Sequence, residues 1–298
     1  MPSSSTSIRS LRRSPSSSPA DAAPISPHGS SVAPWPLVAT LVDVPEVLEV
    51  ELTRQGVASV IERTIVAVER TDDLVVAPGV DAVAHGAFIE SLSRRGKQLV
   101  VETDHGALGV HLGMTGRLLL DDTDPLGRLT YGSRDENPVW DRWVVRLDDG
   151  RRLRLHDPRR LGRITLDPDV DRLGPDALRL TRRQLAHALA ARTAPLKAVL
   201  LDQQRIAGLG NMLVDEVLWR ACLDPRRPAG ALTGDEVGRL HRTIRRRLPV
   251  MLAAGGSHTG TISSTFRSQG GSCPRCGTEM RRATIGTRTT WWCPVHQV

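Results

Sequence analysis

Two adjacent residues, Pro45 and Glu46, could together perform covalent chemistry. A proline with a free secondary amine is a nucleophile, and a neighbouring carboxyl group can donate a proton, which are the parts of amine-type covalent catalysis. The nitrogen of a proline inside a chain is an amide without useful basicity. This chemistry therefore requires a mature protein that begins at Pro45.

The stretch from Pro45 to Gly56 is also compatible with an ordinary surface helix. Proline is tolerated at the first helical position, and Glu46, Glu49 and Glu51 would be favourable in an electropositive first turn. Acidic first turns are common in surface helices. The stretch alone leaves both interpretations open.

Residues 1–44 decide whether Pro45 can be free. Their first part, rich in Ser, Pro and Ala, cannot bury enough apolar surface to fold, so we expect a disordered leader. An arginine- and serine-rich leader weakly resembles an organellar transit peptide. We favour a third explanation, in which translation starts at Val44, because valine codons serve as start codons in GC-rich bacteria. The segment before Val44 would then be a misassigned leader, and removal of the initiator would expose the amine of Pro45.

The bulk composition narrows the class of protein. A chain of 298 residues can form two or three domains with cores of their own. No apolar run is long enough to span a bilayer, so we expect a cytoplasmic protein without a membrane partner. The net charge of +7 and the pI near 10.1 favour a polyanionic partner. Aromatic residues make up only 3% of the chain, which argues against a single-strand binder that stacks bases on aromatic side chains.

Arginine supplies almost all of the basic charge, and Lys97 and Lys197 are the only lysines. Arginine codons are GC-rich and lysine codons are AT-rich, which indicates a GC-rich genome. A lysine that persists in such a genome is a candidate for a chemical role, although two positions are also compatible with chance.

Residues 45–168 are predicted to form a catalytic β domain. Period-two and β-branched runs without helical patterns between them favour an antiparallel sandwich. Turns are expected at 104–106 and at 149–150, the second of which closes a hairpin. The runs are Thr64–Val68, Leu74–Val76, Gln98–Val101, Leu108–Leu112, Trp143–Leu147 and Arg152–Leu155.

Residues 176–256 are predicted to be helical. Capping boxes at Thr181 and Thr233 open two helices, and the runs 196–202 and 212–220 form two more. The last two are joined by a glycine-bearing connection, with Asn211 expected as the N-cap. Helix N-termini and loop amides bind phosphate, so this connection favours docking of nucleic acid. A glycine-bearing connection of this kind also joins consecutive helices in many ordinary helical bundles.

Residues 268–298 carry the spacing of a zinc finger. A CxxC pair and a CxxH pair, separated by sixteen residues that suit a β-hairpin, predict one tetrahedral structural Zn²⁺ without an open position. The arginines of the finger form either a basic binding face or a solvated charge run. The predicted ligands are Cys273, Cys276, Cys293 and His296, and the arginines are Arg281, Arg282 and Arg288.

Together and in this order, these segments resemble the formamidopyrimidine-DNA glycosylase / endonuclease VIII family of base-excision repair enzymes. The resemblance covers the chain from Pro45 to the C-terminus and implies a multidomain α+β fold. Each motif is weak by itself, but their joint order and spacing are specific. The matching segments are Pro45-Glu46 with Glu49 and Gly56, Arg95-Gly96-Lys97, His111–Gly116, Asp157–Arg160, Leu201–Gln203 with Gly208–Asn211, and the finger with Arg288.

The resemblance implies a bifunctional DNA glycosylase and AP lyase. Pro45 would attack C1′ of the damaged nucleotide and form a Schiff base, after which β- and δ-elimination cut the strand. Glu46 would protonate the sugar ring oxygen, and Glu49 would support the opened sugar. Lys97 would contact phosphates and assist elimination, and Arg288 would grip the phosphates that flank the lesion.

The resemblance also implies a partner and a set of contacts. The partner would be double-stranded DNA with damaged bases or abasic sites, bound by a monomer at the bacterial nucleoid. Met114 and Arg159 would fill the hole that a flipped-out base leaves, at an unstacking cost of a few kcal/mol. The expected DNA-binding residues are Met114, Arg159, Arg160, Arg192, Lys197 and Asn211.

The sequence departs from the family pattern at four places. Leu48 replaces a usual proline, and Leu161 replaces a phenylalanine wedge, which changes the handling of the opposite base. The segment before Cys273 is shorter than the loop that caps oxidised purines, which argues against 8-oxoguanine as the favoured lesion. Oxidised pyrimidines, abasic sites and ring-opened purines stay open. His296 replaces a cysteine and should still bind zinc.

Two other classes of protein compete with the enzyme. If the leader stays attached, the same fold would be a non-catalytic binder of damaged duplex DNA, because the nitrogen of Pro45 would be an amide. A zinc-ribbon protein that binds RNA or another protein is the third class. It leaves Pro45-Glu46 and Asn211 unexplained together.

Overall fold

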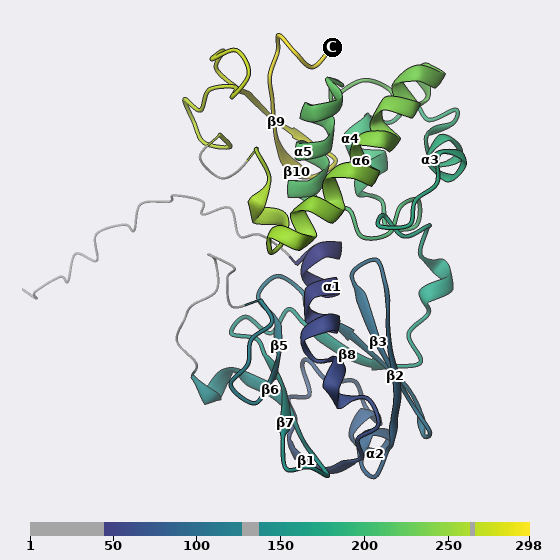
Figure 1. The fold of residues 1–298 in the computed structure, drawn as a ribbon, viewed down its shortest axis with the longest axis vertical. Coiled ribbons are helices and arrows are strands. Elements are labelled where there is room, and N and C mark those ends of the chain that lie inside the picture. Colours follow the sequence, from purple (N-terminus) through teal and green to yellow (C-terminus); the bar gives the residue numbers. More distant parts are fainter. Residues whose placement is uncertain (1–44, 127–136, 263–265) are drawn as a thin grey trace, which may run out of the picture. The chain divides into compact units, whose positions relative to one another are not determined.

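The computed structural model describes residues 45–126, 137–262 and 266–298 (Figure 1). The predicted leader, residues 1–44, lies outside the described residues. Within the described part of the chain, an antiparallel β domain precedes a helical domain and a two-stranded hairpin.

Helix α1, Val47–Gly56, begins two residues after Pro45. Glu46 is its N-cap, and Glu46 and Glu49 form a capping box at the helix start. Pro45 therefore precedes the helix and does not occupy its first turn. The helix is also not an ordinary surface helix, because Val47, Leu48 and both glutamates are at most 2% exposed.

Two four-stranded antiparallel sheets form the β domain, with strand orders β1-β6-β7-β5 and β2-β3-β4-β8. Alternate residues of both sheets, among them Ile65, Leu155, Leu99 and Val110, share one hydrophobic core. The predicted sandwich is thereby confirmed. The strands are β1 Ile65–Arg70, β2 Ile89–Arg95, β3 Gln98–Thr103, β4 Gly106–His111, β5 Arg117–Leu120, β6 Asp141–Leu147, β7 Arg152–His156 and β8 Arg163–Leu166, and a short helix, α2, spans Val80–Ala84.

The strand predictions were right for β1, β3, β4, β6 and β7. The turns at 104–106 and 149–150 close the β3–β4 and β6–β7 hairpins as expected. The run Leu74–Val76 is not a strand, because it makes only an isolated bridge from Val76 to Ile164. Strands β2, β5 and β8 were not predicted. Strand β2 is polar and its pairing shifts register between Ile89 and Ser91, which hides the period-two pattern. Strands β5 and β8 have only four residues each, too few for a clear pattern.

The helical domain contains α3 Arg182–Leu189, α4 Leu196–Leu201, α5 Asn211–Ala221 and α6 Gly234–Ala254. Both predicted capping boxes are present, at Thr181 and at Thr233. Asn211 is the first helical residue and not the N-cap, which is Gly210. The correction has a physical reason, since a carboxylate from another helix already binds the amides that an Asn211 cap would satisfy.

The C-terminal hairpin consists of β9, Arg281–Ile285, and β10, Arg288–Trp292. Its two turn residues, Gly286 and Thr287, both have positive φ, as a tight two-residue hairpin requires. Trp219 of α5 and Trp291 of β10 pack in one apolar cluster with two of the cysteines. Among the helices of the described ranges, none is long and apolar enough to cross a membrane.

Truncation of the sandwich core should destabilise the β domain. Leu155 is fully buried at the centre of the sheet, so Leu155→Ala should lower the free energy of unfolding by about 2–5 kcal/mol through lost transfer energy and a residual cavity. Urea denaturation measures the change. Leu74→Ala is the control, because Leu74 is 61% exposed and its loss should cost less than about 0.5 kcal/mol. Equal effects of the two substitutions would contradict the assigned core.

Candidate active site and metal centre

Glu46 is bound by the N-terminus of α5. Its carboxylate accepts hydrogen bonds from the backbone N–H groups of Gly210 at 2.8 Å, Met212 at 2.8 Å and Leu213 at 3.2 Å. The side chain is almost completely buried. Free amides at a helix N-terminus favour negative charge, so α5 holds the carboxylate of a residue 164 positions before Gly210 in the chain.

The environment of Glu46 suits a proton donor. Burial raises its pKa to about 7, against the opposing effects of Lys97 and of the amide hydrogen bonds. A carboxyl group with this pKa is present in both protonation states near neutral pH. General acid catalysis is most efficient when the pKa of the acid lies near the working pH.

Glu49 connects the start of α1 with the turn that follows α6. One carboxylate oxygen accepts the N–H of Glu46 at 2.8 Å. The other accepts both the N–H of Ser257 at 2.6 Å and its hydroxyl at 2.7 Å. The carboxylate is thus fixed in a buried position beside Glu46. Ser257 was missed in the sequence, because nothing in a Gly-Gly-Ser-His segment points to a distant glutamate.

Lys97 lies in the turn of the β2–β3 hairpin and is half-buried. Burial lowers its pKa, while Glu46 and Glu49 raise it and Arg288 lowers it further. These interactions place the ammonium group within electrostatic reach of both carboxylates and of the first residue of β10. Pro45 is buried directly before Glu46. The structure therefore gathers the five predicted catalytic residues, whose roles stay predictions.

Asp157 joins two of the predicted DNA-contacting loops. Its buried carboxylate accepts the hydroxyl of Thr115 at 2.5 Å, the N–H of Arg159 at 3.2 Å and the N–H of Gly162 at 2.7 Å. Met114 is half-buried and Arg159 is exposed. The carboxylate of Asp157 thus holds both loops that carry Met114 and Arg159. These two side chains were predicted to fill the space that a flipped-out base leaves in the duplex.

The remaining predicted DNA-binding residues differ in their surroundings. Arg160 is about half exposed, has a φ of 56°, and pairs with Asp72 at 2.8 Å. Arg192 is exposed. Asn211 presents a buried Oδ1 that has no hydrogen-bond partner among the described residues. Arg160 and Arg192 are thus accessible cations, and Asn211 has an acceptor to offer.

The structure corrects the expectation for Lys197. This lysine is 0% exposed, and its ammonium group donates to Asp215 at 2.6 Å and to the carbonyl oxygen of Thr289 at 3.2 Å. It is therefore not a surface cation available to phosphate, and it links α4, α5 and β10. Arg267 shares Asp215 at 3.3 Å and is also buried. Arg267 was missed in the sequence, because one arginine among many carries no signal of burial.

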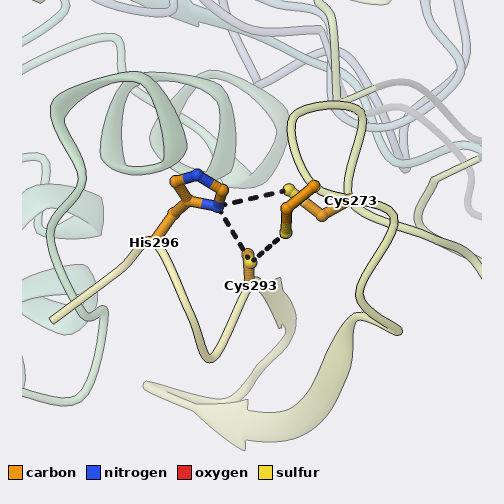
Figure 2. Close-up of side chains that lie close together, drawn as sticks. Cys273, Cys293 and His296 are labelled. Atoms are coloured by element: carbon orange, nitrogen blue, oxygen red, sulfur yellow. Dashed lines mark hydrogen bonds between the residues drawn. The ribbon is translucent and has the colours of Figure 1, made fainter.

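The four predicted metal ligands come together at the C-terminal hairpin. The ligand atoms of Cys273, Cys276, Cys293 and His296 all lie within 4.8 Å of one another. Figure 2 shows three of these side chains converging, with Nδ1 of His296 3.5 Å from the sulfur of Cys293 and 3.9 Å from that of Cys273. The indole N–H of Trp219 points at the sulfur of Cys273, at 3.4 Å. Three thiolates and one imidazole fit a tetrahedral metal ion, and all four positions would be taken by protein.

These features define a class of proteins in which a β-sandwich and a helix-two-turns-helix domain meet at two buried glutamates. Residues 44–164 match the family model described as the formamidopyrimidine-DNA glycosylase N-terminal domain, and residues 173–263 match the H2TH domain of the same enzymes. The chain belongs to the formamidopyrimidine-DNA glycosylase family.

Individual relatives agree with this assignment. The formamidopyrimidine-DNA glycosylase of Laribacter hongkongensis is 36% identical over 283 residues, which cover 85% of this chain and 100% of that protein. The crystal structure of the MutM (Fpg) protein from Thermus thermophilus is 32% identical, with a TM-score of 0.70 over 85% of this chain and 98% of that one. The Lactococcus lactis Fpg in complex with abasic-site DNA is 27% identical, with a TM-score of 0.70 over 85% and 99% of the two chains.

The raised pKa of Glu46 predicts a specific pH dependence of stability. The folded pKa of about 7 lies above the ordinary value of 4.5, so the contribution is present at low pH and is lost as pH rises through 7. The free energy of unfolding should fall by about 2 kcal/mol between pH 5 and 8, relative to Glu46→Gln. Urea titrations of both proteins across this range give the difference. A difference that does not change with pH would contradict the raised pKa.

Proposed function

We propose that the protein is a bifunctional DNA glycosylase and AP lyase of base-excision repair, which removes oxidised or ring-opened bases through Pro45. The observation that carries the proposal is the placement of Glu46. A carboxyl group with a pKa of about 7 lies directly after Pro45 and is held by three backbone amides. This arrangement supplies a proton donor next to a candidate amine nucleophile.

The proposed reaction assigns each group one step. The amine of Pro45 forms a bond to C1′ of the damaged nucleotide as the bond between C1′ and the base breaks, and the base leaves with the proton that the amine gives up. Glu46 then gives its proton to the ring oxygen as the bond between C1′ and that oxygen breaks and the sugar opens. The resulting iminium ion makes the neighbouring C–H acidic. In β- and then δ-elimination the sugar loses one C–H proton to solvent and one phosphate at each step, which cuts the strand on both sides. Lys97 and Arg288 stabilise the negative charge of the phosphates, and Glu49 supports the opened sugar.

Double-stranded DNA with damaged bases or abasic sites is the proposed partner. Solved Lactococcus lactis Fpg structures contain DNA with an abasic site and DNA with Fapy-dG. We extend this partner to the present chain because it has accessible cations in Arg159, Arg192 and Arg288, and a net charge of +7. We further propose that it acts as a monomer in the bacterial cytoplasm, at the nucleoid.

The mechanism needs a free amine at Pro45, so we propose Pro45 as the mature N-terminus. In support, the family match begins at residue 44. The match to the Laribacter hongkongensis relative covers all of that protein with 85% of this chain. If residues precede Pro45 in the working protein, the same fold can only bind damaged DNA.

One structural zinc ion is the proposed occupant of the cysteine–histidine cluster. Borderline-soft Zn²⁺ prefers thiolate and imidazole ligands in tetrahedral sites, which is the donor set of Cys273, Cys276, Cys293 and His296. A bound ion would fix the hairpin that carries Arg288 and would take no part in the reaction.

Borohydride trapping tests the nucleophile. A chain that begins at Pro45 should become covalently attached to abasic-site DNA, and Pro45→Gly should weaken this trapping at least about tenfold, because a poorer and differently placed amine replaces the proline. Glu46→Gln should slow base removal by about 10²–10⁴-fold and leave DNA binding largely intact. Gel electrophoresis of trapped and cleaved DNA reports both effects.

The control for trapping is the chain of all 298 residues. If it keeps its leader, it should bind DNA without trapping. Wild-type-like trapping by Pro45→Gly, together with wild-type-like base removal by Glu46→Gln, would contradict the assigned roles.

Metal analysis tests the zinc proposal. Mass spectrometry of the purified protein should find about one zinc ion per chain, and Cys276→Ser should lose most of the metal and bind DNA more weakly. Cys222→Ser is the matched control, since Cys222 lies outside the cluster and should keep both properties. Retention of zinc by Cys276→Ser would argue against the ligand set.

A further inference from the structure

The backbone just before Lys97 is fixed on both sides by side chains. The N–H of Gly96 donates to Oδ2 of Asp176 at 2.8 Å, and the carbonyl oxygen of Gly96 accepts from Nη1 of Arg94 at 2.9 Å. Gly96 has a φ of 57°, a left-handed conformation that favours glycine. The position of Lys97 is therefore set by Asp176 and Arg94, and not only by the hairpin.

Asp176 and Arg94 form a buried two-pronged ion pair. Nη1 and Nη2 of Arg94 lie 2.6 Å and 3.1 Å from the two carboxylate oxygens, and Nε lies 3.0 Å from Glu51 of α1. The side chains are only 6% and 8% exposed. Loss of the carboxylate would leave a buried guanidinium with one partner fewer, so the ion pair stabilises this geometry of the turn.

Asp176 is also anchored to the loop that positions α1. The next residue, Ala177, donates its N–H to the carbonyl oxygen of Ala207 at 2.9 Å. The neighbouring Gly208 accepts the N–H of Val47, the first residue of α1, at 3.0 Å. A Cβ on Gly96 would lie 2.7 Å from Cβ of Ala207, so the turn packs tightly against this loop. One network thus relates Lys97 to the helix that bears Glu46 and Glu49.

We propose that Asp176 is a positioning residue for Lys97, whose carboxylate holds the Arg94–Lys97 turn so that the ammonium group faces Glu46 and Glu49. The importance of this position for elimination rests on the proposed function. The placement itself does not, because it concerns contacts within the protein.

The two-lysine composition allows a direct test of placement. Biosynthetic incorporation of ¹³C,¹⁵N-lysine into the chain that begins at Pro45 labels only Lys97 and Lys197, buried or not, and NMR then follows the titration of each. The groups that face Lys97 are Glu46 and Glu49 of α1, His111 of β4 and Arg288 of β10. Because burial lowers the pKa of Lys97, release of the turn by Asp176→Asn should raise that pKa toward the ordinary 10.5 and leave Lys197 unchanged.

Asp224→Asn is the matched control. Asp224 is also a buried carboxylate with a two-pronged arginine, Arg226, and it accepts a backbone N–H two residues ahead, as Asp176 does from Leu178. It lies outside the network around Lys97, so its substitution should not move the titration of Lys97. An unchanged Lys97 titration in Asp176→Asn, or an equal change in Asp224→Asn, would overturn the inference.

A second variant tests the same inference if Asp176→Asn does not fold. Gly96→Ala disturbs the same turn from the other side, through its positive φ and the contact with Ala207, and should raise the pKa of Lys97 in the same direction. If it leaves Lys97 unchanged, the turn does not set the position of the ammonium group.

A kinetic comparison then connects placement to the reaction. In single-turnover cleavage of abasic-site DNA, Asp176→Asn should slow elimination at least about tenfold, and it should add no further loss in a Lys97→Ala background. Additive losses would indicate a merely structural role and would contradict the inference. A wild-type protein that neither cleaves nor traps would count against the proposed function, and the NMR titration would still decide the role of Asp176.

Discussion

The structure depends on one interaction, the binding of the Glu46 carboxylate by the N-terminus of α5. A buried carboxylate without partners would be strongly unfavourable, and the first amides of α5 would be unsatisfied without an acceptor. The three hydrogen bonds solve both problems together. They also explain why Asn211 is not the cap and why Gly210 must be glycine, since a Cβ there would lie 2.3 Å from the Glu46 carboxyl carbon.

Helix α1 consequently connects two hydrophobic cores. Val47 and Leu48 pack into the core of the helical domain, whereas Val50 packs into the sandwich. Glu49 adds a second link by binding Ser257 after α6. A helix that shares its side chains between two domains holds its first residues rigidly. This rigidity keeps Pro45, Glu46 and Glu49 in fixed positions relative to Lys97 and Arg288. These last two residues come from two different hairpins.

The electrostatics of the site follow from this burial. Burial raises the pKa of Glu46 and lowers the pKa of Lys97, and each shift is moderated by the other group. Opposed shifts of this kind bring an acid and an amine closer to neutral pH, where both can transfer protons. Lys197 does not join this chemistry through the surface, because its ammonium group is satisfied by Asp215 and the Thr289 carbonyl.

Local patterns in the sequence were sufficient for part of the structure. The capping boxes at Thr181 and Thr233 and the four metal ligands depend on short spacings, and all were found where predicted. The burial of α1 could not be predicted, because its hydrophobic residues serve two cores and its glutamates look like ordinary first-turn acids. Contacts between residues far apart in the sequence also could not be predicted. The site depends on pairings such as Glu46 with Gly210 and Glu49 with Ser257, which backbone amides make across more than 160 residues and no residue type reveals.

The central claim is that the amine of Pro45 is the group that becomes bonded to DNA. The most direct measurement is to isolate the borohydride-trapped complex, digest protein and DNA, and locate the adduct by tandem mass spectrometry. The account predicts a peptide that begins at Pro45 and carries the reduced sugar on its terminal nitrogen. An adduct on Lys97, or on a chain whose first residue precedes Pro45, would contradict it.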